Sequence, residues 1–314
     1  VERVLKDHHV RCRDRTFTPL VTLWTFLSQV PSPDHSCREA VARLIAFRVA
    51  PGQKPCGPET GSYCKARQRL PRKGVTDLAR GTAPELDETA QGSWTWDGRR
   101  VRWVEGTTVS LPDTKAHREA FPQPRSQGPG VGSPLARRVA VIALAPGAVR
   151  ELALGPSKGK QTGETALFRT PWDRFATGDL ILGDRYCASS FGIAPLLGRG
   201  VDGPFRMHQR RKYDFRRGRR LGVEDQVVRG TKPKRPEWRD EAWYAPLPAE
   251  RLVRELRVKV QRDGFRGDEL VLVTTLLDPQ GSTKEELADL DLERWNLERD
   301  LRSIKTVMPM DVLR

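Results

Sequence analysis

Apolar residues near the start of the chain recur at helical spacing. From Phe17 to Val30 they follow one another at intervals of three or four, as in an amphipathic helix. A second helix is expected after the start signal Ser32-Pro33-Asp34, and the same period returns from Tyr63 to Leu70. We therefore predict an N-terminal helical region over residues 1–93. This region either binds DNA or covers the domain that follows.

From Trp94 onward the period shortens to that of β-strands. Arg100 to Leu111 predicts one strand, or a hairpin bent at Gly106. Further strands and helices are expected at Val139–Leu144 and Val149–Leu154 (a hairpin around Pro146-Gly147), Gly163–Phe175 (helix), Leu180–Gly183 (buried strand), Ser189–Leu197 (helix) and near Phe205 (strand). Strands joined first by a hairpin and then by helices predict an α/β fold, a mixed sheet flanked by helices, with residues 94–207 as the first part of its core.

The segment after Phe205 departs from this rhythm. Arg206 to Arg239 is strongly basic with interleaved aromatic residues, and β-type runs follow at Arg254–Val260 and Glu269–Leu276. Such a basic run is often a solvated surface, but the aromatic residues favour a folded, β-rich insertion over residues 208–280 with a phosphate-binding face. Residues 281–314 then hold a last helix from Leu287 to Met308.

The composition of the chain indicates what kind of partner it binds. With 55 Lys and Arg against 40 Asp and Glu, the 314-residue chain carries a net charge of +15 and a pI near 10.0. That balance favours a polyanion, nucleic acid first and an acidic membrane surface second. It also favours DNA contact for the helical region. No apolar run has the length to cross a bilayer and the N-terminus lacks a signal-peptide core, so we expect a soluble cytoplasmic protein that binds no membrane.

The cysteines and histidines indicate no site. The five cysteines form no C-x-x-C pair, so neither a disulfide framework nor a zinc ribbon is predicted.

The last helix carries the first candidate chemistry. At about 100° per residue, four side chains fall within a sector of roughly 60°: Asp291, Arg294, Glu298 and Lys305. A separate apolar stripe, suited to docking on a core, consists of Leu290, Leu297, Leu301, Ile304 and Met308. Glu298 between Arg294 and Lys305 suits a carboxylate that holds a metal ion beside phosphates. The alternative is a solvated helix with ordinary i,i+4 ion pairs.

A second acid ends the short buried strand that precedes it. Asp184 follows Leu180–Gly183, and the carboxyl end of such a strand is where α/β folds bind ligands. The alternative is a structural acid that caps the next helix.

Together these features resemble the insertion-sequence-4 family of DDE transposases. The resemblance covers most of the chain and rests on the order of its elements: a strand acid, a second strand acid after a hairpin and helix, a basic β insertion, and a helix similar to Y-x2-R-x3-E-x6-K. Supporting segments are GTTVSLPDT (106–114), FPQPRSQ (121–127), GETALFR (163–169) and GDRY (183–186).

The resemblance implies a ribonuclease-H-like core that cuts transposon ends and joins them to target DNA. Water attacks first, and the freed 3′-hydroxyl then attacks the target. The implied metal ligands, for Mg²⁺ with Mn²⁺ as a substitute, are Glu105, Asp184 and Glu298. By position, the resemblance implies DNA contacts by Arg294 and Lys305. The basic residues themselves add Arg302, beside them on the helix, and Arg210, Arg211 and Lys212 in the basic insertion as expected DNA-binding residues. The resemblance also implies that the partner is double-stranded DNA and that the protein is a homodimer in the synaptic complex. It implies a location in the prokaryotic cytoplasm.

Three departures from the family pattern bear on activity. Glu105 stands where the family has Asp, and a carboxylate displaced by on the order of 1 Å can cost about 100-fold in rate. Asp291 stands in place of the signature Tyr and adds negative charge near phosphate, so we expect weaker end binding. The nearby acids Asp97 and Asp113 are explained by turn chemistry. The chain also stops at Arg314, shortly after Lys305, as expected of a shortened copy.

Other classes remain open. A catalytically impaired remnant would occupy transposon ends without cutting, and a nuclease on the same core would cut DNA without joining strands. A protein that merely binds RNA would leave Asp184 and Glu298 unexplained.

Overall fold

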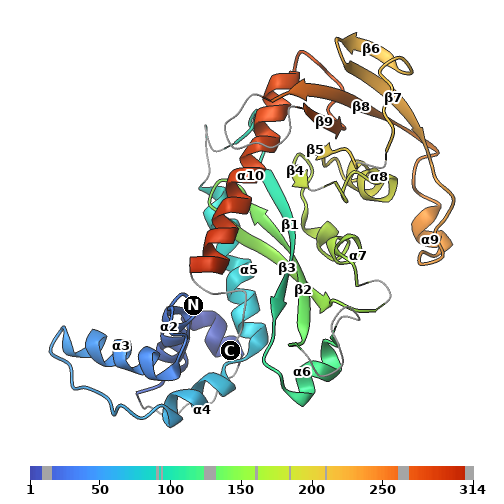
Figure 1. Cartoon of the computed structure of the whole chain (residues 1–314). Helices are drawn as coiled ribbons and strands as arrows, with labels where there is room; N and C mark the ends of the chain where they lie inside the picture. Colours follow the sequence, from blue (N-terminus) through green and yellow to red (C-terminus); the bar gives the residue numbers. More distant parts are fainter. Residues whose placement is uncertain are drawn as a thin grey trace.

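The computed structural model (Figure 1) describes residues 1–8, 16–89, 92, 95–123, 132–159, 162–183, 185–208, 211–260 and 269–307. In the last helix, side chains at 296, 297, 300, 301 and 303–307 are not part of that description, nor are those at 2 and 6.

The N-terminal region is helical, as the sequence predicts. Thr18 caps the second helix by accepting from the Val21 amide, and Ser36 caps the third by accepting from the Glu39 amide. The helices are α1 (Glu2–Asp7), α2 (Pro19–Gln29), α3 (Cys37–Val49), α4 (Gly61–Arg69) and α5 (Arg72–Glu88).

The inner face of α2 differs from the one that its apolar spacing indicates. Leu23 is buried, but Trp24 is 58% exposed and Leu27 is 43% exposed. The reason is Gln29, which is buried and polar: it donates to the His35 carbonyl and accepts from the Tyr63 hydroxyl at 2.6 Å. These bonds satisfy the buried amide, which would be costly without partners, and they join α2 to α4.

All the strands form one mixed sheet, in the order β3-β2-β1-β4-β5-β9-β8-β7-β6. The pairs β1–β4 and β4–β5 are parallel and the others are antiparallel. The strands are β1 (Val101–Ser110), β2 (Leu135–Ala143), β3 (Ala148–Pro156), β4 (Leu180–Gly183), β5 (Pro204–Arg206), β6 (Arg219–Gly222), β7 (Asp225–Thr231), β8 (Glu250–Lys259) and β9 (Glu269–Thr274). The predicted α/β class with a mixed sheet is confirmed.

Individual strands also match their patterns. β1 runs unbroken through Gly106, which pairs with Val139, so the alternative of a bent hairpin is wrong. The expected hairpin is β2–β3, and its turn contains Gly147 at φ +63°, a conformation that suits glycine.

Helices cover both faces of the sheet. On one face, α7 (Glu164–Phe168), the 3-10 helix η2 (Thr170–Arg174) and α8 (Ser190–Leu197) pack on Val104, Ile181 and Phe205. On the other, α10 (Lys284–Val307) packs its N-terminal half on β1, β4, β8 and β9. Figure 1 shows α10 along one side of the strands and α7 and α8 along the other. The short helices α6 (Lys115–Ala120) and α9 (Glu241–Tyr244) lie outside these layers.

The expected β-rich insertion continues the central sheet. β9 pairs with both β5 and β8, and β7 and β6 extend the sheet to its far edge. Residues 208–280 are therefore joined to the preceding strands by backbone hydrogen bonds.

An ion-pair cluster fastens α5 to the sheet. Asp87 is fully buried and accepts from Arg102 of β1 at 2.7 Å and from Arg150 of β3 at 2.6 Å. Arg102 also contacts Asp179, just before β4, at 3.1 Å. Burial raises the pKa of Asp87, but its arginine partners lower it by more, so the net pKa lies below the ordinary 3.8.

No helix within the described ranges is both long enough and apolar enough to cross a membrane.

Candidate active site

The carboxyl end of β4 lies beside the middle of β1, which continues to Ser110. The two strands are parallel, and their register ends with Val104 opposite Gly183. The next residue of β1 is Glu105, and the next residue in the chain after β4 is Asp184. Asp184 itself lies outside the described residues.

Strand alternation sets the face on which Glu105 lies. Side chains two apart along a strand point to the same side. Val101 and Trp103 belong to the cluster that packs on Leu290 of α10, together with Leu180 and Leu182 of β4. The half-buried Glu105 therefore points to the side of the sheet that α10 covers.

The last helix brings its acid along this same face. Leu287 and Leu290 are buried against the sheet, as the predicted role of Leu290 requires. Glu298 lies eight residues beyond Leu290, about 12 Å further along the helix axis. Its side chain is 33% exposed, and its Oε1 accepts a hydrogen bond from Arg294.

The charged sector of α10 is more buried than a solvated helix face. Asp291 and Arg294 are 1% and 4% exposed. Asp291 accepts from Arg206 of β5 at 2.8 Å, and its other oxygen is 3.9 Å from the Nε of Arg294. A chain of charges thus runs from Arg206 through Asp291 and Arg294 to Glu298. Local i,i+4 pairing between Arg294 and Glu298 is present, but it forms at a buried position.

The other predicted DNA-binding residues are spread over two regions. Arg302 is exposed on α10, whereas the side chain of Lys305 lies outside the described residues. Arg211 donates to Glu255 at 3.1 Å, and Lys212 beside it is exposed. Arg210 is also outside the described residues.

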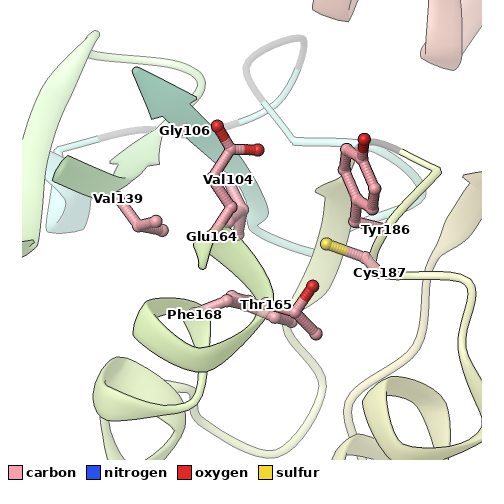
Figure 2. A pocket seen from close by; sticks show the side chains of 8 residues that line it. All are labelled: Val104, Gly106, Val139, Glu164, Thr165, Phe168, Tyr186 and Cys187. Atoms are coloured by element: carbon pink, nitrogen blue, oxygen red, sulfur yellow. The ribbon is translucent and has the colours of Figure 1, made fainter. Parts of the chain in front are cut away.

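A pocket on the opposite face was not anticipated from the sequence. It lies beside the middle of β1 and is lined by Val104, Gly106, Val139, Glu164, Thr165, Phe168, Tyr186 and Cys187. Figure 2 shows the Glu164 side chain reaching up beside Gly106, with Tyr186 and Cys187 across the pocket. A Cβ on Gly106 would lie 2.6 Å from Cδ of Glu164, so a larger residue there would displace the Glu164 carboxylate. The only sequence signals were the segments containing Glu164 and Tyr186, to which no role was given.

Within the part of the chain that the structure describes, no three His, Cys, Asp or Glu residues are grouped closely enough to hold a metal ion. Asp184 is outside that part, so the predicted trio is represented by Glu105 and Glu298 alone.

The sequence matches no model of a known protein family and no curated protein.

Proposed function

We propose that this protein is a DDE-type transposase that binds transposon-end DNA and catalyses metal-dependent strand cleavage and strand transfer. The observation that carries the proposal is the parallel register of β1 and β4, which ends with Val104 opposite Gly183. It supports convergence of two acids that stand 79 positions apart in the chain, Glu105 and Asp184.

The finer fold proposal is a ribonuclease-H-like core. It is supported by the antiparallel strands β3-β2-β1, to which β4 and then β5 are added in parallel. Helices on both faces of this unit agree with the same proposal.

The residues that would hold Mg²⁺ or Mn²⁺ are Glu105, Asp184 and Glu298. They fit in kind, because Mg²⁺ takes oxygen ligands and is commonly held by a few carboxylates beside phosphate. When bound, two such ions supply a clamp on the attacking and leaving oxygens of an in-line displacement. Arg294 holds Oε1 of Glu298, so Oε2 is the oxygen that would face the metal.

Cationic side chains then position the DNA. Arg302 is exposed one helical turn beyond Glu298, and Lys212 is exposed near the start of the β-rich segment 208–280. We assign both to phosphate contacts, with Lys305, Arg210 and Arg211 as further contacts. Arg294, which is buried and bonded to Glu298, acts by orienting that carboxylate.

The test is cleavage of a linear DNA that carries the ends of the element encoding this chain, with Mg²⁺ or with EDTA. We expect Mg²⁺-dependent cutting that Asp184→Asn and Glu298→Gln abolish while the variants stay folded. The matched control is Asp289→Asn, an exposed acid on the same helix, which should cut like the parent. Undiminished cutting by Asp184→Asn would refute the assignment.

A catalytically impaired, DNA-binding relative is the second candidate. Two observations favour it: Glu105 replaces the family's Asp, and Glu298 is already engaged by Arg294. End binding without metal-dependent cutting would select this candidate. Nicking without strand transfer, measured in a separate assay, would select a nuclease.

A further inference from the structure

An aromatic and cationic cluster lies on the side of the sheet away from α10. Trp172 of η2 stacks on Trp243 of α9 with ring centroids 6.5 Å apart, and Phe191 of α8 contacts Trp238 and Trp243. Trp172 belongs to the core layer that includes Val104 and Ile181, the layer opposite the one that packs on Leu290. The cluster is therefore anchored to the α7 and α8 side.

Two arginines lie on these rings. The guanidinium carbon of Arg169 is 3.7 Å from the centroid of Trp238, and that of Arg239 is 4.4 Å from the centroid of Trp243 and 5.4 Å from that of Trp238. Both guanidinium groups therefore lie within cation–π range of Trp238. The rings fix both side chains in place, so little further ordering is needed for them to bind a ligand.

Neither arginine is neutralised by a carboxylate among the residues described. The acids nearby in the chain are used elsewhere or point outward: Asp240 caps α9 by accepting from the Trp243 amide, Glu241 pairs with Arg235 at 3.2 Å, and Glu237 is exposed. By contrast, the half-buried Arg211 pairs with Glu255. Two adjacent cations without a counterion favour an anion between them.

The burial of the two groups supports this reading. The Nε atom of each guanidinium is buried without a hydrogen-bond partner. Burial, and then the charge of Arg239, lower the pKa of Arg169 to about 10. Both effects report a cationic site that lacks compensating negative charge, which a bound oxyanion would supply.

We propose that Arg169 and Arg239 form a phosphate-binding site for a nucleic-acid backbone on the α7 and α8 side of the sheet, separate from the metal site on the α10 side. The choice of nucleic acid rests on the proposed function and on the net charge of +15. Lys234 and Arg235 are exposed in the same loop and extend the positive surface along which a backbone would run.

The experiment measures binding of a fluorescent 30-base-pair duplex by the full chain in EDTA, over a series of salt concentrations. Each phosphate contact contributes about 0.9 to the slope of log affinity against log salt, so Arg169→Gln with Arg239→Gln should lower the slope by about 2. Arg118→Gln with Arg199→Gln removes the same charge from two exposed, acid-paired positions and should leave the slope unchanged. The lysine pair, Arg169→Lys with Arg239→Lys, keeps the charge and should retain most of the slope.

Circular dichroism and thermal unfolding of each variant separate a lost site from a lost fold, and Arg239→Gln alone, which should lower the slope by about 1, tests the site if the glutamine pair does not fold. An unchanged slope in a folded glutamine pair overturns the proposal. Quenching of tryptophan fluorescence by inorganic pyrophosphate, with DNA binding unaffected, would assign the site to a small phosphorylated ligand and overturn the nucleic-acid assignment. Binding in EDTA uses neither Glu105 nor Glu298, so failure here is distinguishable from failure of the cleavage test.

Discussion

At the scale of single residues, Asp291 shows how the fold accommodates a departure from the pattern of the proposed family. An acid at this position was expected to repel phosphate, yet it is 1% exposed and bonded to Arg206. Its charge is largely compensated within the fold. The pair joins α10 to β5 across 85 positions of sequence, so it also contributes to docking the helix that carries Glu298.

The first prediction concerns this pair. Asp291→Tyr should lower the free energy of unfolding by about 1–3 kcal/mol, because it leaves the partly buried Arg206 without this carboxylate. Urea unfolding measures the change, and Asp289→Asn, exposed on the same helix, should shift it by no more than about 0.5 kcal/mol. A stability equal to that of the parent would show that Arg206 does not depend on Asp291.

The same residue bears on activity. From the family pattern alone, Glu105→Asp together with Asp291→Tyr should raise cleavage. The structure gives different expectations for the two substitutions. Glu105→Asp alone should raise the cleavage rate, by up to about 100-fold if the placement of this carboxylate limits the rate. Asp291→Tyr should add to the gain only if the fold tolerates the loss of the Arg206 pair. The measurement is single-turnover cleavage of the cognate end, with Asp97→Asn, a turn residue, as the control.

At the scale of elements, α10 depends on a few buried leucines. Leu290 packs in one buried cluster with Trp103 of β1 and Leu182 of β4, and no charged residue could replace that contact. The position of Glu298 follows from the docking of this half of the helix.

Leu290→Ala should therefore cost about 2–5 kcal/mol of unfolding free energy, through lost burial and the cavity left behind. Chemical unfolding gives the value. Leu27→Ala makes the same change at a 43% exposed position and should cost far less. If the two substitutions cost the same, α10 is not docked on the sheet as described.

At the scale of the whole molecule, a few buried carboxylates each form ion pairs with several arginines. Asp87 faces three arginines, and Glu151 joins Arg80 of α5 to Arg174 of η2. Burial raises the pKa of Glu151, but the bonds from Arg80 and the Leu152 amide lower it by more. Both acids thus bind protons less readily when folded than when unfolded.

The pH dependence follows from these two depressed pKa values. Stability from both acids is present above their unfolded values, 3.8 and 4.5, and is lost as the pH falls through the lower folded values. We expect unfolding free energy to fall below about pH 4. Asp87→Asn should lower the unfolding free energy by about 3–5 kcal/mol at pH 7, because it leaves buried arginines uncompensated. It should also make the unfolding free energy depend less steeply on pH at acid pH. A dependence as steep as in the parent would contradict the assignment.

Much of the fold was predictable because its signals are local. Ser36 and Thr18 cap their helices, the β2–β3 turn has its glycine, and the buried run before Asp184 forms β4. Prediction failed at α2, where a buried glutamine outweighed the apolar period and left Trp24 exposed. The Glu164 pocket was missed because it depends on how closely a helix approaches Gly106.

By itself, the sequence determined the class of the elements, the basic charge and the residue types available for chemistry, since these depend on local spacing and composition. Tertiary structure alone decided that Val104, next to Glu105, pairs with Gly183, that Arg206 pairs with Asp291, and that Arg169 and Arg239 both lie on the Trp238 ring. The reason is physical: strand register and side-chain pairing between distant segments are selected by the packing of the whole core, which no single stretch of sequence encodes.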